Sequence, residues 1–377
     1  MLKNTSQKRA AETEYRLDDL RVADRREVDD ISYHETREFL DPEEARTRRF
    51  EPCSVGFTWE RGREATAEDR REAAANVLTG EVSDDLEVGR NIWFRLRFEV
   101  PEAMAGHPVY LRFVAGPNDR SDERGTPRVE SLCFRDGVPW KAFDNAHESL
   151  LLAEDANGGE RFDLLVEAGT TTLWGNLDVE EFVLRTAEVY AERPAVDDLY
   201  RRVSVYNDLR EKLNEDSPTR GRILNAVVAA SHAFPFDADT EADYRKGAQL
   251  ALEPLEAVGD EAKSDLTGQQ LTAVGHAHID LAWLWPWSET VRKCGRSFAN
   301  VLRVMEEYPE FTFMQSQPHL YEWVRNRYPE QFEAIEERIS ERRWQPEGAL
   351  WVESDINNAG PEALARQFLL GKRYFRE

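Results

Sequence analysis

The chain has 377 residues, of which 41% are hydrophobic, and this is enough for a sizeable core and for two or three domains. Its formal net charge is −24, so its surface would repel a phosphate backbone and a nucleic acid is not an expected partner. No run of about 18 apolar residues occurs, so we expect no membrane span.

The basic residues are unusual in kind, because 41 are arginine and only 8 are lysine, against 73 acidic residues. Acid-rich, lysine-poor surfaces are typical of salt-adapted proteins, with an ordinary acidic cytosolic protein as the alternative. The three cysteines lie far apart, so neither a disulfide framework nor a cysteine zinc site is indicated. The first residues lack the apolar stretch of a signal peptide, and the expected location is the cytoplasm.

The first half of the chain divides into two segments. Residues 1–50 are a charged helical N-terminal extension, in which sparse apolar positions between residues 8 and 48 predict an exposed helix followed by an acidic loop. Residues 51–187 are a predicted β-sandwich domain, because short alternating strands are separated by Gly and Asp/Asn turns. The predicted strands cover residues 92–100, 109–115, 129–134, 162–168 and 182–187.

The second half is predicted to be helical and then α/β. Residues 188–266 have apolar positions at helical spacing, which favours a helical connector. Residues 267–377 alternate strands and helices, which predicts a βαβαβ unit of a parallel sheet with right-handed crossovers. The expected elements are a strand at 271–275, a helix at 289–308 capped by Ser288, a strand at 311–314, one helix from Pro318 towards Ser340, an extended segment near 344–351 and a helix from Pro361.

Two histidines and an aspartate follow the first of these strands, as His276, His278 and Asp280. On an extended segment these three side chains project to one side. Imidazole and carboxylate are ligands of catalytic zinc, so His278 and Asp280 are candidate zinc ligands and His276 a candidate outer partner. The alternative is that the histidines are hydrogen-bonded structural residues.

Ligands of parallel α/β sheets bind outside the carboxyl ends of the strands. Three segments are predicted to meet there: residues 276–280, 316–318 and 351–357. Glu353 and Asp355 face one side of an extended segment, and one of them can serve as nucleophile or metal ligand. A solvated acidic loop is the alternative for this segment.

The same stretches resemble the α-mannosidases of glycoside hydrolase family 38. The resemblance is specific over residues 267–377 and weaker over 52–187, and it rests on Gly275-His-Ala-His-Ile-Asp-Leu-Ala-Trp-Leu-Trp-Pro, Glu289-Thr-Val-Arg-Lys-Cys, Ser316-Gln-Pro, Trp351-Val-Glu-Ser-Asp-Ile-Asn and Arg366-Gln-Phe-Leu-Leu-Gly-Lys-Arg-Tyr-Phe. It implies a retaining exo-acting α-mannosidase of the cytosolic and bacterial branch, acting on terminal α-mannosides of glycans. Residues 267–377 would then be the N-terminal part of a β/α-barrel-like catalytic domain.

The resemblance also implies site roles. One Zn²⁺ would be held by His278, Asp280 and Asp355, with Asp355 as the catalytic nucleophile. The sugar-contacting candidates are Trp283, Gln317, Trp351 and Glu353.

Two departures from the family pattern matter. The turn before the last helix reads Asn358-Ala-Gly-Pro-Glu-Ala, where the family has Gly-Glu-Ser. The family's last zinc-ligand histidine and its acid/base carboxylate match nothing in this chain. We therefore expect a truncated catalytic domain with little activity alone, which a downstream polypeptide completes. The competing functions are a non-catalytic carbohydrate-binding protein and a different, amidohydrolase-like zinc hydrolase that uses His276 and His278.

Overall fold

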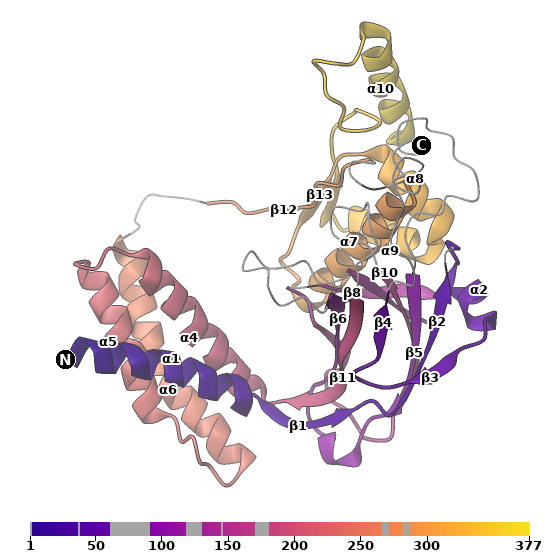
Figure 1. Cartoon of the computed structure of the whole chain (residues 1–377). Coiled ribbons are helices and arrows are strands. Elements are labelled where there is room, and N and C mark those ends of the chain that lie inside the picture. Colours follow the sequence, from indigo (N-terminus) through magenta and orange to yellow (C-terminus); the bar gives the residue numbers. More distant parts are fainter. Residues whose placement is uncertain are drawn as a thin grey trace.

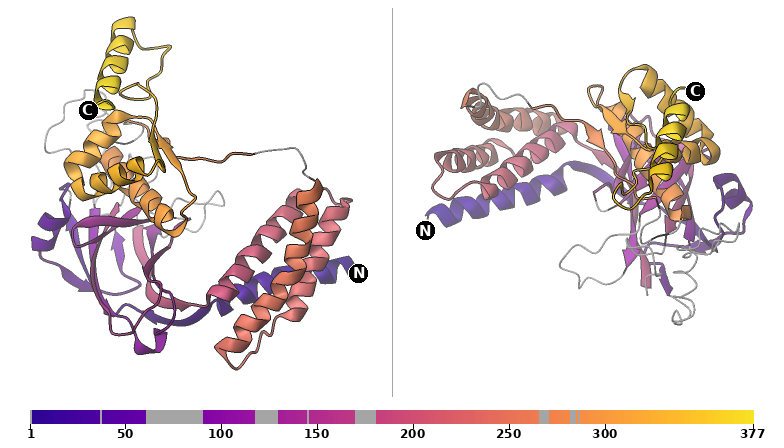
Figure 2. Two further views of the ribbon diagram at one scale, coloured as in Figure 1. Left: turned by 180° about the vertical axis from the view of Figure 1, so that it is seen from behind. Right: turned by 90° about the horizontal axis from the view of Figure 1, so that it is seen from above.

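The computed structural model describes residues 2–36, 38–60, 91–117, 130–144, 146–169, 181–265, 271–281, 285 and 287–377. These residues form a helical bundle, a β-sandwich and a small α/β unit (Figure 1). The bundle lies to one side of the sandwich, whereas the α/β unit is stacked directly on the sandwich (Figure 2).

The sandwich consists of two antiparallel sheets. The first has the strand order β1-β11-β6-β9, with β4 also paired to β11, and the second has the order β3-β2-β5-β10-β7-β8. The first sheet contains β1 (Val22–Glu27), β4 (Thr58–Glu60), β6 (Val109–Pro117), β9 (Ser149–Ala153) and β11 (Glu181–Glu192). The second contains β2 (Asp30–Thr36), β3 (Glu51–Cys53), β5 (Asn91–Glu99), β7 (Ser131–Arg135), β8 (Val138–Phe143) and β10 (Arg161–Gly169), and the connections carry α2 (Pro42–Thr47) and the 3₁₀ helix η1 (Glu102–Met104).

Strand β5 shows why the two sheets pack together. Its residues Ile92, Phe94 and Leu96 lie in the core between the sheets, as their period-two spacing predicts. Trp93 points to the opposite face and is also fully buried, because the α/β unit covers that face. All five strands predicted for the sandwich are confirmed within a few residues, although β1 to β4, β8 and β9 were not predicted.

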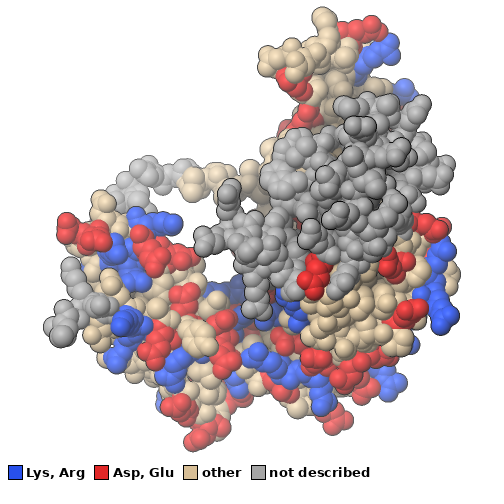
Figure 3. Space-filling model, viewed as in Figure 1, with Lys and Arg blue, Asp and Glu red and all other residues tan. Residues whose placement is uncertain are grey.

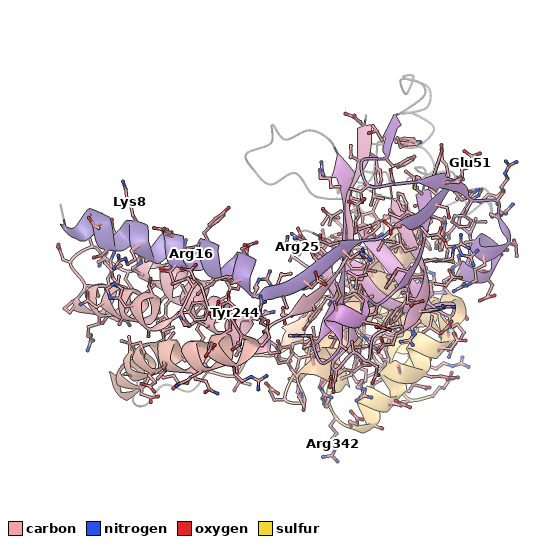
Figure 4. The ribbon with its side chains drawn as sticks, turned by 90° about the horizontal axis from the view of Figure 1, so that it is seen from below. Lys8, Arg16, Arg25, Glu51, Tyr244 and Arg342 are labelled. Atoms are coloured by element: carbon pink, nitrogen blue, oxygen red, sulfur yellow. The ribbon has the colours of Figure 1, made fainter. Side chains whose placement is uncertain are left out.

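The helix predicted at the start of residues 8–48 is confirmed, but it is not fully exposed, and the acidic loop predicted after it is wrong. The first helix, α1 (Leu2–Leu20), buries Ala10 and Leu17 completely in the bundle core. The next residues form β1 and β2, which join the two sandwich sheets. Figure 4 shows Lys8 and Arg16 on α1 and Arg25 on β1, where the chain passes from the bundle into the sandwich.

The bundle combines α1 with three helices that follow the sandwich in sequence. These are α4 (Pro194–Lys212), α5 (Pro218–Ala233) and α6 (Glu241–Asp265). A buried amide also links α1 to α4, because Asn207 Nδ2 donates to Glu14 Oε2 at 2.7 Å. The predicted helical connector is therefore confirmed from residue 194, whereas residues 188–192 complete β11. The three boundaries between the four predicted segments remain a prediction.

The α/β unit has the predicted βαβαβ order, and its three short strands are parallel in the order β12-β13-β14. Its elements are β12 (Gly275–His276), α7 (Trp287–Glu307), β13 (Phe313–Gln315), α8 (Pro318–Arg327), α9 (Pro329–Ser340), β14 (Trp344–Pro346) and α10 (Pro361–Tyr374). Helices α7 and α9 contact strand β8 of the sandwich, and Figure 1 shows both of them directly above the sandwich.

Three local predictions for this unit are wrong. Residues 271–274 are not part of a strand, and Leu271 is 94% exposed. Ser288 lies inside α7 rather than before it, and its buried hydroxyl has no hydrogen-bond partner among the described residues. The helix expected from Pro318 is two helices, because Pro329 favours an extended backbone at Tyr328, where φ is −135°.

Buried ion pairs join α7 to the sandwich. Arg292 Nε lies 2.8 Å from Glu167 Oε1, and each side chain is only 4% exposed. Glu130, at the edge of β7, accepts from both Lys293 Nζ and Arg296 Nη2 at 2.8 Å. We call this set the interface cluster, which consists of Glu130, Glu167, Glu289, Arg292, Lys293 and Arg296.

The described surface mixes charges of both signs. Figure 3 shows acidic and basic side chains interspersed over the bundle and the lower part of the sandwich. None of the helices in the described ranges is long and apolar enough to cross a membrane.

Candidate active site at the ends of the parallel strands

The candidate site lies where the three parallel strands end. In the sheet, His276 is level with Met314, and Gln315 is level with Pro346. Because the strands run in one direction, the residues that follow them leave the same edge of the sheet. Residues 277–280 and 316–317 follow β12 and β13, and residues 347–358 follow β14.

His278 is the centre of the contacts at this edge. Its Nδ1 lies 2.6 Å from Glu353 Oε2, and its Nε2 lies 3.2 Å from Asp280 Oδ1. Ser316 Oγ donates to the other carboxylate oxygen of Glu353. We call His278, Asp280, Ser316 and Glu353 the site cluster. It brings together all three segments that were predicted to meet, and its side chains remain accessible, with His278 57% exposed.

The two carboxylates determine the protonation of His278. Partial burial lowers the pKa of the His278 ring, but the hydrogen bonds to Asp280 and Glu353 raise it by more. The pKa of His278 therefore lies above its usual value, which favours the imidazolium form that can donate to both carboxylates.

Buried glutamines hold the backbone of the segments. Gln315 Nε2 donates to Ala277 O at 2.8 Å, and Gln317 Nε2 donates to Ile279 O at 2.9 Å. Gln317 Oε1 also accepts from the backbone N–H of Glu353 at 3.1 Å. The Gln317 side chain thus joins the loop after β12 to the loop after β14 through hydrogen bonds that lie beneath the site cluster.

Helix α10 holds the segment after β14 from the other side. The backbone N–H of Trp351 donates to Gln367 O, and that of Val352 donates to Gln367 Oε1. The indole ring of Trp351 packs edge-on against His319 and Tyr374. Trp351 is half-buried in this arrangement.

Asp355 does not join the site cluster. Its carboxylate accepts from the backbone N–H of Asn357 at 2.9 Å and from Asn358 Nδ2 at 2.5 Å. Asp355 therefore closes the turn that follows it, and it is exposed. Across the described ranges, no three His, Cys, Asp or Glu side chains converge closely enough to hold a metal ion.

The other predicted site residues occupy different surroundings. His276 is exposed and lies at the end of β12, level with Met314 of β13. Gln317 is only 2% exposed, so its amide lies below the accessible surface of the site. Trp283 lies outside the described residues.

Two residues at the site were missed. Ser316 contacts Glu353, and Gln367 holds the backbone of residues 351–352. Period two would have found Ser316, because Gln315 and Gln317 face the interior and the residue between them must face the other side. No sequence signal connects Gln367 to a segment 15 residues earlier.

His319 is a further residue whose surroundings the sequence did not predict. Its ring packs against Trp287, Trp323 and Trp351 at centroid distances of 4.1 to 6.1 Å. Burial lowers the pKa of His319, and neither ring nitrogen has a hydrogen-bond partner among the described residues. The ring is therefore a neutral part of an aromatic cluster beside the site.

The donor set of His278 and Asp280 fits a zinc ion as two of its ligands. A carboxylate on the second ring nitrogen of a histidine ligand is the usual outer partner in zinc sites, and Glu353 occupies that place at Nδ1. Zinc binding would displace the proton from Nε2, which already faces Asp280. The described residues supply two candidate ligands and one candidate outer partner, which is fewer than a zinc site needs.

Two regions of the chain match family models of glycosidase domains. Residues 268–377 match the glycosyl hydrolases family 38 N-terminal domain, and residues 88–190 match the alpha-mannosidase jelly roll domain. The chain thus contains regions similar to two domains of α-mannosidases, as the resemblance in the sequence implied.

The curated proteins to which this chain is similar are all named alpha-mannosidases. Alpha-mannosidase 2C1 of Homo sapiens is 32% identical over 297 residues, which cover 75% of this chain and 27% of that protein. Alpha-mannosidase G of Dictyostelium discoideum is 27% identical, with coverages of 76% and 26%. Alpha-mannosidase of Saccharomyces cerevisiae is 27% identical, with coverages of 84% and 31%. The chain therefore spans between a quarter and a third of the length of these relatives.

Among solved structures, β-glucuronidase from Ruminococcus gnavus is 12% identical with a TM-score of 0.26, covering 45% of this chain and 29% of that chain. This likeness is too weak to assign a fold or a function.

Proposed function

We propose that this chain contributes to a retaining, exo-acting α-mannosidase that hydrolyses terminal α-mannosides of glycans. The observation that carries the proposal is the contact between His278 and Glu353 at 2.6 Å, which joins segments after the first and third parallel strands. The match of residues 268–377 to family 38 and the names of the relatives support the same reaction class.

The proposed zinc ligands are His278 and Asp280, with Glu353 as the acceptor at His278 Nδ1. A bound zinc ion would fix hydroxyl groups of the terminal sugar. The 46% exposure of the Asp280 side chain and the 57% exposure of His278 leave both groups accessible to a sugar from solvent.

Asp355 is the proposed nucleophile, which would attack the anomeric carbon and form a glycosyl-enzyme. Its support is its place two residues after Glu353, in the segment that reaches the site cluster. Asp355 would have to give up its hydrogen bonds to Asn357 and Asn358 to act on a sugar or to touch the zinc ion. Trp351 and Trp283 are the proposed stacking residues for the sugar ring.

The proposal includes a further polypeptide segment that supplies the remaining zinc ligand and the acid/base carboxylate. Its support is that only two candidate ligands converge within the described ranges and that both are exposed. The greater length of the relatives is consistent with this. A cytoplasmic location and salt adaptation remain predictions from composition.

The test is zinc content and hydrolysis of p-nitrophenyl α-mannoside in high salt. The chain is measured alone and together with the polypeptide encoded immediately downstream. We expect the mixture to contain bound zinc and to release mannose. Both bound zinc and mannose release should be lost when Asp280→Asn is introduced.

The variant Asp355→Asn separates zinc binding from hydrolysis. We expect this variant to keep most of the zinc bound through His278 and Asp280 but to lose hydrolysis. Zinc without hydrolysis in every sample would contradict the catalytic role and leave a carbohydrate-binding protein.

A further inference from the structure

Gln317 has an unusual position for a glutamine. It is the residue immediately before α8, where a short polar side chain normally caps the helix, yet its side chain makes no capping hydrogen bond. Its amide is instead buried, with 2% of the residue exposed. A buried polar side chain that does not serve its own helix indicates a role elsewhere.

Both ends of the Gln317 amide are used on loops of the candidate site. Nε2 donates to the carbonyl of Ile279 at 2.9 Å, and Oε1 accepts from the N–H of Glu353 at 3.1 Å. Ile279 lies between His278 and Asp280 in the chain, and its own side chain is 4% exposed. One amide group thus joins the backbone that carries the proposed zinc ligands to the backbone that carries their outer partner.

We propose that Gln317 is a positioning residue that sets the distance between the loop after β12 and the loop after β14. Its role for zinc binding rests on the proposed function, but the tie between the loops does not. The geometry thereby assigns Gln317 a place beneath the site, in contrast to the sugar contact expected from sequence.

Gln317 can set this distance because its amide N–H bonds to the backbone of the loop after β12 and its amide oxygen bonds to the backbone of the loop after β14. Without the amide, the Ile279 carbonyl and the Glu353 N–H each lose the partner that Gln317 gives them. A buried polar group without a partner is costly, so the loops would move apart or admit water. Either change would disturb the contact between Glu353 and His278, which spans the same two loops.

Gln315 offers a matched control two residues away. It is fully buried, and its Nε2 also donates to the loop after β12, at Ala277 O. Its Oε1, however, accepts from the N–H of the neighbouring Ser316 and not from the loop after β14. Loss of the Gln315 amide removes equally buried hydrogen bonds but leaves the tie to Glu353 intact.

The first measurement is hydrogen exchange of the Glu353 amide by NMR, on the whole chain without zinc, for the wild type, Gln317→Met and Gln315→Met. We expect exchange at Glu353 to become at least about tenfold faster in Gln317→Met, because the loss of one hydrogen bond opens this site locally. In Gln315→Met it should stay at the wild-type rate. Urea unfolding of both variants checks that their global stabilities are similar.

The second measurement is zinc affinity by titration with zinc alone. We expect Gln317→Met to bind zinc about 10- to 100-fold more weakly than Gln315→Met, as for other outer partners of zinc ligands. A buried carboxyl favours its protonated form, in which Gln317→Glu keeps an acceptor for Glu353 N–H and an O–H donor for Ile279 O, so this variant should retain slow exchange at Glu353. This variant also tests the tie if Gln317→Met does not fold.

Equal exchange at Glu353 in Gln317→Met and the wild type would overturn the inference, as would equal acceleration in Gln315→Met. If Gln317→Met does not fold, fast exchange at Glu353 in Gln317→Glu overturns it. If exchange behaves as expected and no form of the chain binds zinc, the tie between the loops is established and the zinc-dependent function fails. The two failures are thereby distinguishable.

Discussion

The interface cluster and the site cluster are both built from charged side chains, but they differ in burial and in charge balance. The interface cluster is mostly buried, with only the Glu130 side chain as much as 31% exposed, and it combines three carboxylates with three cations. The site cluster is exposed and places two carboxylates on a single imidazole. A balanced, buried cluster needs no further ion, whereas the site cluster has a surplus of negative charge that a metal cation would neutralise.

The pKa shifts follow the same difference. Burial raises the pKa of Glu289 in the interface cluster, but Arg296, Arg292 and Lys293 lower it by more, so this carboxyl has a pKa below its usual value. In the site cluster partial burial lowers the pKa of His278, but the hydrogen bonds and negative charges of Asp280 and Glu353 raise it by more, so this pKa lies above its usual value. Charge balance, more than the presence of charges, separates the structural set from the candidate functional set.

The largest expected effect is the loss of Glu167 from the interface cluster. Glu167→Ala leaves Arg292 buried without its 2.8 Å partner, and we expect the free energy of unfolding to fall by about 3–5 kcal/mol. Urea unfolding measures this, with Glu99→Ala as the control. Glu99 pairs with Arg161 on the same sheet with both side chains exposed, so its loss should cost about 0–1 kcal/mol.

A double variant completes this test. Glu167→Leu combined with Arg292→Met removes both charges and should recover most of the stability, because two apolar groups leave nothing unpaired. Equal losses for Glu167→Ala and Glu99→Ala would contradict the view that the interface cluster is structural.

An intermediate effect is expected for the site cluster. Glu353→Gln removes the carboxylate at His278 Nδ1, and we expect zinc affinity to fall about 10- to 100-fold while stability changes little. Glu347→Gln is the control, because Glu347 is exposed on the same segment and has no contact with His278. Titration with zinc measures both. If the two variants bind zinc alike, the effect reflects net charge alone and the outer-partner role of Glu353 is lost.

The sequence predicts those features of the fold and of the site cluster that depend on local residue patterns. Five short strands, with the alternation around Phe94 the clearest, predicted the sandwich without six of its strands, and the order of strands and helices after residue 270 predicted the parallel unit. The meeting of His278 with Glu353 followed from the rule that parallel strands end at one edge. The break at Pro329 was also readable, because the residue before a proline avoids helix.

What depends on distant partners was not predictable. Helix α1 looks exposed in isolation, but Leu17 is buried by helices almost 200 residues later. The strand β1 is rich in charged residues, and only its pairing with β11 makes it a strand. The partners of the Gln317 amide likewise lie 38 and 36 residues away, so its position beneath the site has no local signal.

A third cluster sharpens the comparison, because its two buried carboxylates, Glu192 and Asp197, share Arg21, while Asp197 also pairs with Arg201. Arg21 lies 3.5 Å from Glu192 and 3.2 Å from Asp197, where the bundle meets the sandwich. Burial and the neighbouring Asp197 raise the pKa of Glu192 to about 7, and Arg21 and Arg201 offset only part of this rise. Glu192 is therefore a buried carboxyl that titrates near neutral pH.

The smallest expected effect is the pH dependence that Glu192 causes. Its pKa is raised on folding, so between the ordinary value of 4.5 and about 7 the folded protein holds more protons than the unfolded one. The contribution of Glu192 to the free energy of unfolding is thus fully present below the ordinary value and is lost as the pH rises through about 7. Glu192→Gln removes this contribution, so urea unfolding at pH 5 and pH 8 should differ less in the variant than in the wild type.

The control for this measurement is Glu188→Gln, on the same strand, where Glu188 pairs with Arg112 at 3.7 Å. We expect it to keep the wild-type difference between the two pH values. If Glu192→Gln keeps that difference as well, Arg21 satisfies both of its buried carboxylates, and surplus negative charge would then have a measurable consequence only where solvent and a metal ion can reach it.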